Sequence, residues 1–361
     1  MKKLFSLILV FIVLLAHFSG CKKPETVLCQ SDLLKVHFID AGQGDCTFIE
    51  TADGHCVMID AASDIRAESV FEYVAELGYR HIDILVLTHA HVDHVGGVDK
   101  LLDTFTVGTV YMPDKPDTRG EGQRLRTLFS ERGIEAKDAY MGTSFSFGET
   151  KFEFLFPLRK DLEKENDNCA VLRLKYKSRV FLFMADAGYE TERELVHLYS
   201  DLHADVIKAG HHGGDDSSGT EFISAVGAGY VVFCCGEGNE FGHPTPVAVW
   251  RWEQSGAVSF RTDEDSSVVF CTDGDGMLCA PFSDESYWRE HTELLPYEFE
   301  PVTVKADCKY LINIKSYSVH KKGCIFAEKA DPNNIERTNE STERLISEGY
   351  TLCRNCFITE D

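Results

Sequence analysis

One stretch, Thr88 to Gly97 (THAHVDHVGG), constrains the fold of this chain more than any other. It follows residues 81–88 (HIDILVLT), which are apolar and β-branched enough to form a parallel strand buried on both faces. Residues 93–105 then place apolar side chains at helical spacing. The polar side chains between them therefore lie in a strand-to-helix turn, at the carboxyl end of a strand, where open α/β sheets place their sites.

Four side chains in this turn have the character and spacing of metal ligands: His89, His91, Asp93 and His94. A single histidine here would be explained by a satisfied hydrogen bond in a protein core. Four metal-binding groups within six residues are not explained in that way. The turn therefore predicts a metal site.

Two later turns repeat the pattern of an apolar strand followed by metal-binding groups. Residues 179–184 (RVFLFM) lead to Asp186, and residues 204–209 (ADVIKA) lead to His211 and His212 in a glycine-rich turn. Because the carboxyl ends of such strands meet at one edge of a sheet, we expect one common cluster. In this cluster Asp186 bridges two metal ions, and either His211 or His212 completes the ligands. A role as a helix cap is the alternative for Asp186.

The first twenty residues have the pattern of a secretory signal. Two lysines precede an apolar run over residues 4–16, which is too short to span a membrane, and small residues precede Cys21. Residues 18–21 (FSGC) resemble a bacterial lipoprotein processing site, although Phe18 stands where such sites usually carry Leu. We therefore expect an exported protein anchored to a membrane surface through a lipid on Cys21. An unlipidated secretory signal is the alternative.

The chain is strongly acidic, and this limits the substrates that it can hold. It contains 59 acidic and 36 basic residues, for a formal net charge of −23. Such a surface repels polyanions, whereas affinity for duplex nucleic acid rests on Lys and Arg at the phosphates. Extended binding to a duplex is therefore disfavoured, and attraction for a phosphate must come from a local feature such as bound cations.

Eight segments between residues 33 and 275 give the chain a family resemblance. In order they are HFIDAGQGD (37–45), VMIDAA (57–62), LVLTHAHVDHVGG (85–97), NDNCAVLRL (166–174), FLFMADA (181–187), DVIKAGHHGGDDSS (205–218), NEFGHPTP (239–246) and RTDEDSSV (261–268). Their order and spacing resemble the metallo-β-lactamase fold, and more narrowly the hydrolase domain of the ComEC family of competence proteins.

The resemblance implies an α/β fold, a four-layer αββα sandwich over residues 33–280, and a hydrolase with one or two metal ions. An all-nitrogen-and-oxygen ligand set suits zinc or manganese. Most metallo-β-lactamase relatives place a third histidine on the first metal, in an interval where this chain has no histidine. ComEC-type domains have an asparagine-containing stretch there, and Asn168 occupies it in this chain as a candidate for first-metal or substrate contact. Occupancy of the first metal position is therefore left open.

The chemistry that this ligand set predicts is hydrolysis of a phosphodiester or a related ester by attack of metal-bound hydroxide. Asp93 and His94 reach the second ion, and Asp60, at the end of its strand, holds the metal-binding turn by hydrogen bonds. His243, in the turn Phe241 to Pro244, is a candidate for contacting a developing oxyanion or protonating a leaving group. Nucleic acid and phosphorylcholine-type esters are the substrate options. The alternative is a non-catalytic surface lipoprotein with structural metal sites that binds a partner.

The end of the chain, residues 305–361, has a second metal-binding pattern. His320 and Cys324 form one short pair, and Cys353 and Cys356 form another, with the spacing of a structural zinc site. The pattern is similar to the small metal-binding domain of the Ada repair protein, with His320 where that family has its first cysteine. We therefore expect a small zinc module, with a disulfide among the three cysteines as the alternative.

Overall fold

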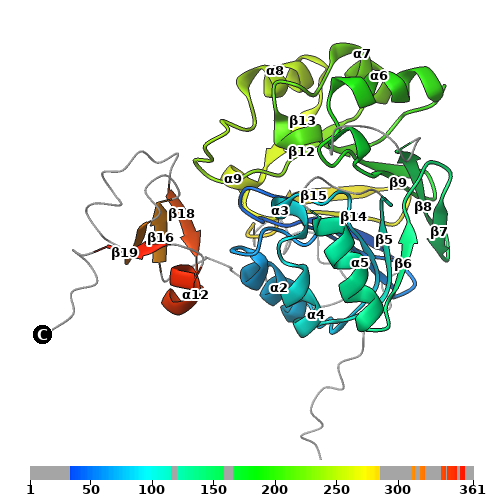
Figure 1. The fold of residues 1–361 in the computed structure, drawn as a ribbon. Helices are drawn as coiled ribbons and strands as arrows, with labels where there is room; N and C mark the ends of the chain where they lie inside the picture. Colours follow the sequence, from blue (N-terminus) through cyan, green and yellow to red (C-terminus); the bar gives the residue numbers. More distant parts are fainter. Residues whose placement is uncertain are drawn as a thin grey trace, which may run out of the picture. The chain divides into compact units, whose positions relative to one another are not determined.

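The structure is a computed structural model that describes residues 33–114, 120–157, 166–284, 310–313, 318–321, 335–338, 340–347 and 350–353. Residues 1–20 and the expected lipidation site Cys21 lie outside the described residues, as do Cys324 and Cys356. Among the helices of the described ranges, none is long and apolar enough to cross a membrane. The described elements form three β-sheets with helices around them (Figure 1).

The first sheet has eight strands in the order β15-β14-β1-β2-β3-β4-β5-β6. In chain order they are β1 (Leu34–Phe38), β2 (Thr47–Glu50), β3 (Cys56–Ile59), β4 (His81–Val86), β5 (Thr106–Met112), β6 (Glu135–Asp138), β14 (Val268–Thr272) and β15 (Met277–Pro281). Strands β3 to β6 run parallel, so their carboxyl ends meet at one edge of the sheet.

The second sheet has seven strands in the order β13-β12-β11-β10-β9-β8-β7. In chain order they are β7 (Ser144–Phe147), β8 (Thr150–Phe156), β9 (Val171–Tyr176), β10 (Arg179–Phe183), β11 (Val206–Lys208), β12 (Tyr230–Phe233) and β13 (Val258–Arg261). Strands β10 to β13 are parallel. This sheet therefore also gathers the ends of consecutive parallel strands at a single edge.

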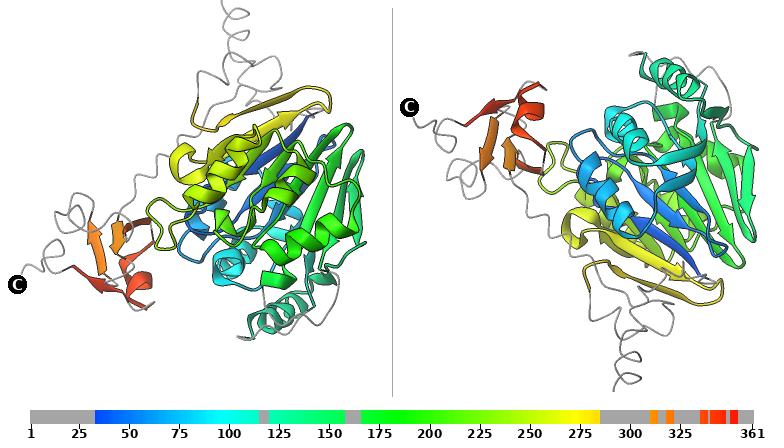
Figure 2. Two further views of the ribbon diagram at one scale, coloured as in Figure 1. Left: turned by 90° about the horizontal axis from the view of Figure 1, so that it is seen from above. Right: turned by 90° about the horizontal axis from the view of Figure 1, so that it is seen from below.

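The two sheets pack face to face, and helices cover their outer faces. A buried apolar cluster that includes Phe38, Phe154 and Phe181 joins the inner faces of both sheets. Helices α2 (Ala67–Glu76), α4 (Val98–Thr104) and α5 (Glu121–Glu131) share a second buried cluster with the first sheet. Helices α6 (Tyr189–Leu198), α7 (Thr220–Val226) and α8 (Pro246–Gln254) share a third with the second sheet. The layers are thus helix, sheet, sheet and helix (Figures 1 and 2).

The end of the domain returns to its start, and one expected helix is divided. The glycine-rich residues 273–276 form the hairpin turn between β14 and β15. These two strands belong to the first sheet, beside β1, so the chain returns to its first half instead of continuing the second. The expected helix over residues 93–105 is broken into α3 (Val92–Val95) and α4.

The break falls at Gly96 and Gly97, where backbone segments pack closely. A Cβ atom on Gly97 would lie 2.1 Å from the carbonyl oxygen of Ala61. On the other side of the turn, a Cβ atom on Gly44 would lie 2.4 Å from the carbonyl oxygen of Asp93. Neither distance is compatible with a side chain. The glycines therefore allow the loops after β1 and β3 to pack directly against the turn of residues 88–97.

The third sheet belongs to the end of the chain. Its strand order is β18-β16-β17-β19. The strands are β16 (Tyr310–Asn313), β17 (Ser318–Lys321), β18 (Ile335–Thr338) and β19 (Thr351–Leu352), and α12 (Thr342–Ser347) packs against them through Leu345. Its described core is small and consists of Ile312, Val319, Leu345 and Tyr350. A core of this size supplies little stability, which is why small modules often need a metal or a disulfide.

Candidate metal centre

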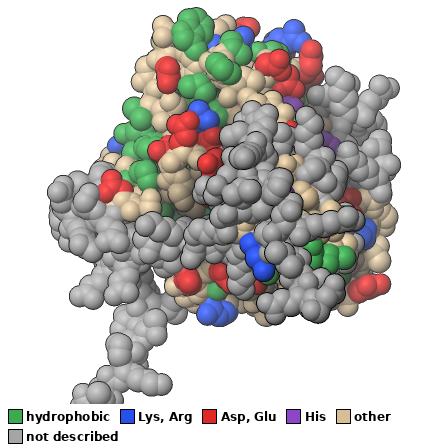
Figure 3. Space-filling model, turned by 90° about the vertical axis from the view of Figure 1, so that its left-hand side faces the viewer, with side chains coloured by type: hydrophobic (Ala, Val, Ile, Leu, Met, Phe, Trp, Pro, Cys, Tyr) green, Lys and Arg blue, Asp and Glu red, His purple; other side chains and the backbone are tan. Residues whose placement is uncertain are grey.

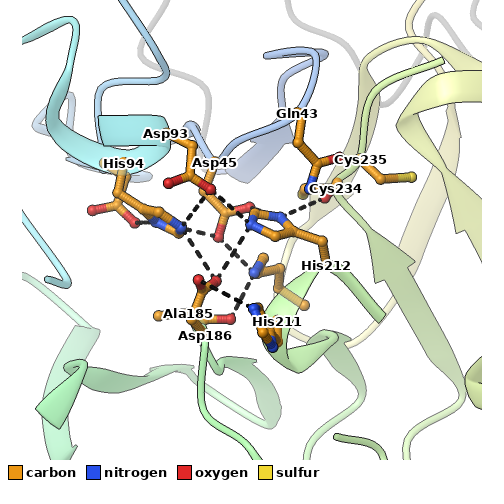
Figure 4. Close-up of polar contacts among 12 residues, drawn as sticks. Gln43, Asp45, Asp93, His94, Ala185, Asp186, His211, His212, Cys234 and Cys235 are labelled. Carbon is orange, nitrogen blue, oxygen red and sulfur yellow. Dashed lines mark hydrogen bonds and ion pairs between the residues drawn. The ribbon is translucent and has the colours of Figure 1, made fainter. Parts of the chain in front are cut away.

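Polar groups that follow five parallel strands, four sets of side chains and one backbone carbonyl, converge at the carboxyl-end edges of the first and second sheets. Asp60 follows β3, the turn of residues 88–97 follows β4, Asp186 follows β10, and the turn of residues 210–213 follows β11. Cys234 follows β12 and contributes its carbonyl group. Figure 4 shows that side chains from segments far apart in the sequence point towards one another.

One group of donor atoms consists of Asp93, His94, Asp186 and His212, whose ligand atoms all lie within 4.8 Å of one another. The Oδ1 atom of Asp186 is 3.2 Å from Nε2 of His94 and 3.4 Å from Nε2 of His212. The Oδ2 atom of Asp93 is 3.2 Å from Nε2 of His212. We call this set the four-donor group.

A second group consists of His89, His91 and Asp186, again within 4.8 Å of one another. The Nε2 atom of His89 lies 3.0 Å from Nδ1 of His91 and 3.5 Å from Oδ2 of Asp186. We call this set the three-donor group. Asp186 thus directs one oxygen atom to each group, which is the geometry of a bridging carboxylate.

His94, His212 and His89 each direct Nε2 into the cluster, and contacts at Nδ1 hold the ring in place. The Nδ1 atom of His94 contacts Oδ2 of Asp60 at 2.7 Å, and Nδ1 of His212 donates to the carbonyl oxygen of Cys234 at 2.8 Å. The Nδ1 atom of His89 lies 3.1 Å from the Thr88 hydroxyl, which itself donates to Asp60 at 2.7 Å. These contacts fix the ring orientation and leave Nε2 of each ring directed into the cluster.

The buried carboxylates set the electrostatics of the cluster. Burial alone would lower the pKa of His94, but Asp186, Asp93 and Asp60 raise it well above its usual value. Burial likewise opposes the charged form of His212, and Asp186 with Asp45 raises its pKa to about 10. The pKa of His89 is lowered, chiefly by burial and by the neighbouring His94. The negative potential that holds protons on His94 and His212 also attracts a divalent cation.

The donor atoms fit a bound metal ion. Within the described residues, Nε2 of His94 and Oδ1 of Asp186 are buried and have no hydrogen-bond partner, although they face each other at 3.2 Å. Unpaired buried polar atoms are costly, and a cation between them would satisfy both. Nitrogen and oxygen donors of this kind suit zinc, manganese or iron more than a soft metal.

Comparison with known proteins decides the family. Residues 39–237 match the Metallo-beta-lactamase superfamily. The chain belongs to this superfamily. It is 24% identical over 259 residues to ComE operon protein 3 of Bacillus subtilis (strain 168), covering 67% of this chain and 33% of that protein. It is 28% identical over 261 residues to Competence protein ComA of Neisseria gonorrhoeae, covering 72% of this chain and 35% of that protein.

The chain therefore spans about a third of the length of these competence-protein relatives. A solved structure, the metallo-beta-lactamase fold protein YhfI of Bacillus subtilis, is 15% identical and has a TM-score of 0.47, covering 67% of this chain and 100% of that chain. The superfamily and the relation to competence proteins agree with the resemblance seen in the sequence.

Two residues of this metallo-β-lactamase centre were not found from the sequence. The Oδ1 atom of Asp45 lies 3.3 Å from Nδ1 of His212, and its Oδ2 atom pairs with Nζ of Lys208 at 2.5 Å. Lys208 is buried and donates to the carbonyl oxygen of Ala185, next to Asp186. The pair therefore ties three segments of the centre together. The available signal was a lysine at the end of an otherwise apolar strand, because a buried charge normally has a partner.

The structure separates the two adjacent histidines. His212 belongs to the four-donor group, whereas His211 lies outside both groups, with Nε2 4.0 Å from Oδ2 of Asp186. The Nδ1 atom of His211 contacts Oδ1 of Asp216 at 2.8 Å. Both histidines have positive φ angles, 46° and 52°, which non-glycine residues rarely adopt and which turn the two rings in different directions.

His243 and Asn168 lie next to the donor groups but are not part of them. The His243 ring is half-buried, and its centroid is 5.4 Å from that of His211 and 6.3 Å from that of His212. Asn168 is buried in a short 3₁₀ helix (Asn166–Asn168). The backbone N–H of Ala170, two residues later, donates to the carbonyl oxygen of Thr88 at 2.8 Å, so this segment adjoins the metal-binding turn.

Proposed function

We propose that the protein is a metal-dependent hydrolase that cleaves a phosphodiester or a related ester, with zinc or manganese at the four-donor and three-donor groups. The carboxylate of Asp186 carries the proposal, because its two oxygen atoms face the two sets of donors separately. Paired sites of this kind act on ester and phosphoester bonds by placing positive charge on both oxygens of the displacement. Members of the superfamily are mostly metal-dependent hydrolases, which supports the reaction class.

The metal ions, when bound, would supply Lewis acidity and lower the pKa of a water molecule. The protein supplies orientation: Asp60 holds His94, and Asp45 with Lys208 holds the segment around His212. His243 faces the same region, where burial and, without bound metal, the positive charges of His212 and His211 lower its pKa to about 4. A neutral His243 ring offers an N–H to a developing negative charge, which favours oxyanion contact over donation of a proton.

Hydrolysis of bis(p-nitrophenyl) phosphate with added zinc or manganese tests the proposal. The wild type is compared with Asp186→Asn and His91→Ala, and with Asp103→Asn as a matched control for the first change. Asp103 is an exposed carboxylate paired with Arg132 at 3.0 Å, away from the donor groups. We expect Asp103→Asn to match the wild type and the other two variants to lose activity. Equal rates in all four proteins would overturn the proposed hydrolase function and favour a non-catalytic metal-binding lipoprotein that binds a partner.

We also propose that the protein is exported and held at a membrane surface by a lipid on Cys21. The support is the pattern of residues 1–21 in the sequence, since this segment lies outside the described residues. Metabolic labelling with a radioactive fatty acid tests the lipid. The wild type should incorporate the label and Cys21→Ser should not, and incorporation by both would refute lipidation at this residue.

A structural zinc ion in the last module is a separate proposal. His320 and Cys353 are both buried. His320 lies in β17 and Cys353 directly follows β19, and these two strands are neighbours, since Val319 pairs with Leu352. The N–H of Cys353 donates to the carbonyl oxygen of Val319 at 2.8 Å. The other two expected ligands, Cys324 and Cys356, lie outside the described residues. Cys353→Ser should lower the zinc content by one ion per chain, and unchanged zinc content would exclude this site.

A further inference from the structure

Two large apolar side chains stand exposed beside the metal centre. Phe241 is 61% exposed and Val92 is 60% exposed. Val92 lies between the donor residues His91 and Asp93 in the sequence. The ring of Phe241 is 5.8 Å from that of His243, with an angle of 31° between the ring planes. The Phe241 ring therefore lies beside the His243 ring at the edge of the centre.

Exposed apolar side chains are common and need no explanation when they are scattered. Trp250 on α8, for example, is 56% exposed. Phe241 differs because its ring continues a series of neighbouring rings that runs through His243 to His212, a member of the four-donor group. A substrate held at the donor groups would thus have an aromatic surface within reach.

Among the described residues, the charges around the centre disfavour a polyanion. Five of the segments that build it, residues 40–45, 88–97, 185–190, 209–219 and 235–246, contain no lysine and no arginine. The cations that contact these segments are engaged: the buried Lys208 pairs with Asp45, Arg66 pairs with Asp40, and Arg251 donates to the Tyr189 hydroxyl. Exposed carboxylates lie on the same segments, at Asp215, Asp216, Glu237 and Glu240. Figure 3 shows histidine side chains at the surface with acidic side chains close by.

We infer that the substrate is a small ester with a single phosphate, flanked by an aromatic or other flat apolar group that packs on Phe241. The inference rests on the proposed function and narrows its substrate class. Strand binding by nucleic-acid proteins combines aromatic stacking with a cationic groove along the phosphates. These segments supply the aromatic surface and lack the cations, so one flat group beside one phosphate is the ligand that they match.

Binding and turnover can be measured separately. Isothermal titration of the zinc-loaded protein with phenylphosphonate and with methylphosphonate measures the contribution of a flat group without catalysis. The wild type should bind the phenyl compound about tenfold more tightly, as expected for a stacked ring. Phe241→Ala should bind both compounds equally, Phe241→Tyr should retain the preference, and Trp250→Ala serves as the exposed-aromatic control. Because Phe241 is mostly exposed, its removal should not affect folding or zinc content.

Turnover supplies the second test. With bis(p-nitrophenyl) phosphate, Phe241→Ala should raise KM about tenfold with little change in kcat, whereas Trp250→Ala should behave as the wild type. A wild type that binds both phosphonates equally, or a Phe241→Ala variant that keeps the preference, would overturn the inference. A single-stranded oligonucleotide cleaved with a higher kcat/KM than the diaryl ester would also overturn it. Preferential phenylphosphonate binding without any hydrolysis would support the apolar contact and refute the proposed function alone.

Discussion

The two donor groups share Asp186 but are built differently. The four-donor group has two carboxylates and two imidazoles, and further buried carboxylates, Asp60 and Asp45, lie against His94 and His212. The three-donor group has one carboxylate fewer, and Nδ1 of its His89 contacts the Thr88 hydroxyl. More donors and more surrounding negative charge favour a divalent cation. We therefore expect one tightly bound ion and one weakly bound ion.

Removal of the shared carboxylate should have the largest effect, because it damages both groups at once. Asp186→Asn deletes the negative charge between the two sets of donors. We expect a loss of kcat of about a hundredfold or more, and a fall in bound metal at both positions. Activity assays and metal analysis by mass spectrometry check this. A variant that loses only one ion would show that Asp186 does not bridge the groups.

The pH dependence of metal binding should distinguish the two groups. Without metal, the raised pKa values of His94 and His212 keep both imidazoles protonated at neutral pH, so a bound cation displaces about two protons. Affinity at the four-donor group should therefore rise with pH, by about a hundredfold per unit near neutrality. His89 has a lowered pKa and no proton to release.

Titration calorimetry in buffers of different ionisation enthalpy measures the protons released per ion. The more tightly bound ion, at the four-donor group, should release about two protons, and the weaker ion should release fewer. Equal proton release by both ions would contradict the electrostatic difference between the groups. The same experiment on Asp45→Asn should show a smaller release of protons by the tighter ion, since Asp45 helps to raise the pKa of His212.

The orientation of His94 by Asp60 should contribute a smaller but selective effect. Asp60→Asn weakens the contact of 2.7 Å with Nδ1 of His94 directly, whereas it reaches the three-donor group only indirectly, through the Thr88 hydroxyl that contacts His89. We expect affinity for the tighter ion to fall about 10- to 100-fold, the range seen when the partner of a metal-binding imidazole is lost. Competition with a chromophoric chelator checks this. A decrease confined to the weaker ion would contradict our assignment of the tight position.

The sequence predicted which turns meet in this candidate centre, and the limits of that prediction have physical causes. The metal-binding turns could be recognised because each follows an apolar strand, and parallel strands bring their ends together whatever the intervening loops. Asp45 and Lys208 could not be placed, since they meet only through the packing of the two sheets. The return of β14 and β15 to the first sheet depends on long-range pairing with β1, which no local pattern encodes.

The choice between His211 and His212 also lay beyond the sequence. The two residues are adjacent and chemically identical, and the decision depends on backbone angles and on which nitrogen is engaged by Asp216 or Cys234. Phe241 is similar, because an exposed aromatic residue has no periodic pattern that marks it as part of a site. In both cases the information is three-dimensional.

Asn168 offers the most direct way to change the weaker group. It is buried in the short helix that adjoins the metal-binding turn, in the stretch that corresponds to the position of a third histidine in many superfamily members. Asn168→His should add an imidazole to the three-donor group and tighten the weaker ion about tenfold, with no change at the tighter ion. Asn166→His, in the same helix, is the matched control. Equal metal affinity in Asn168→His and the wild type would mean that this residue does not reach the three-donor group, and the weakness of that group would then have to come from its surrounding charge alone.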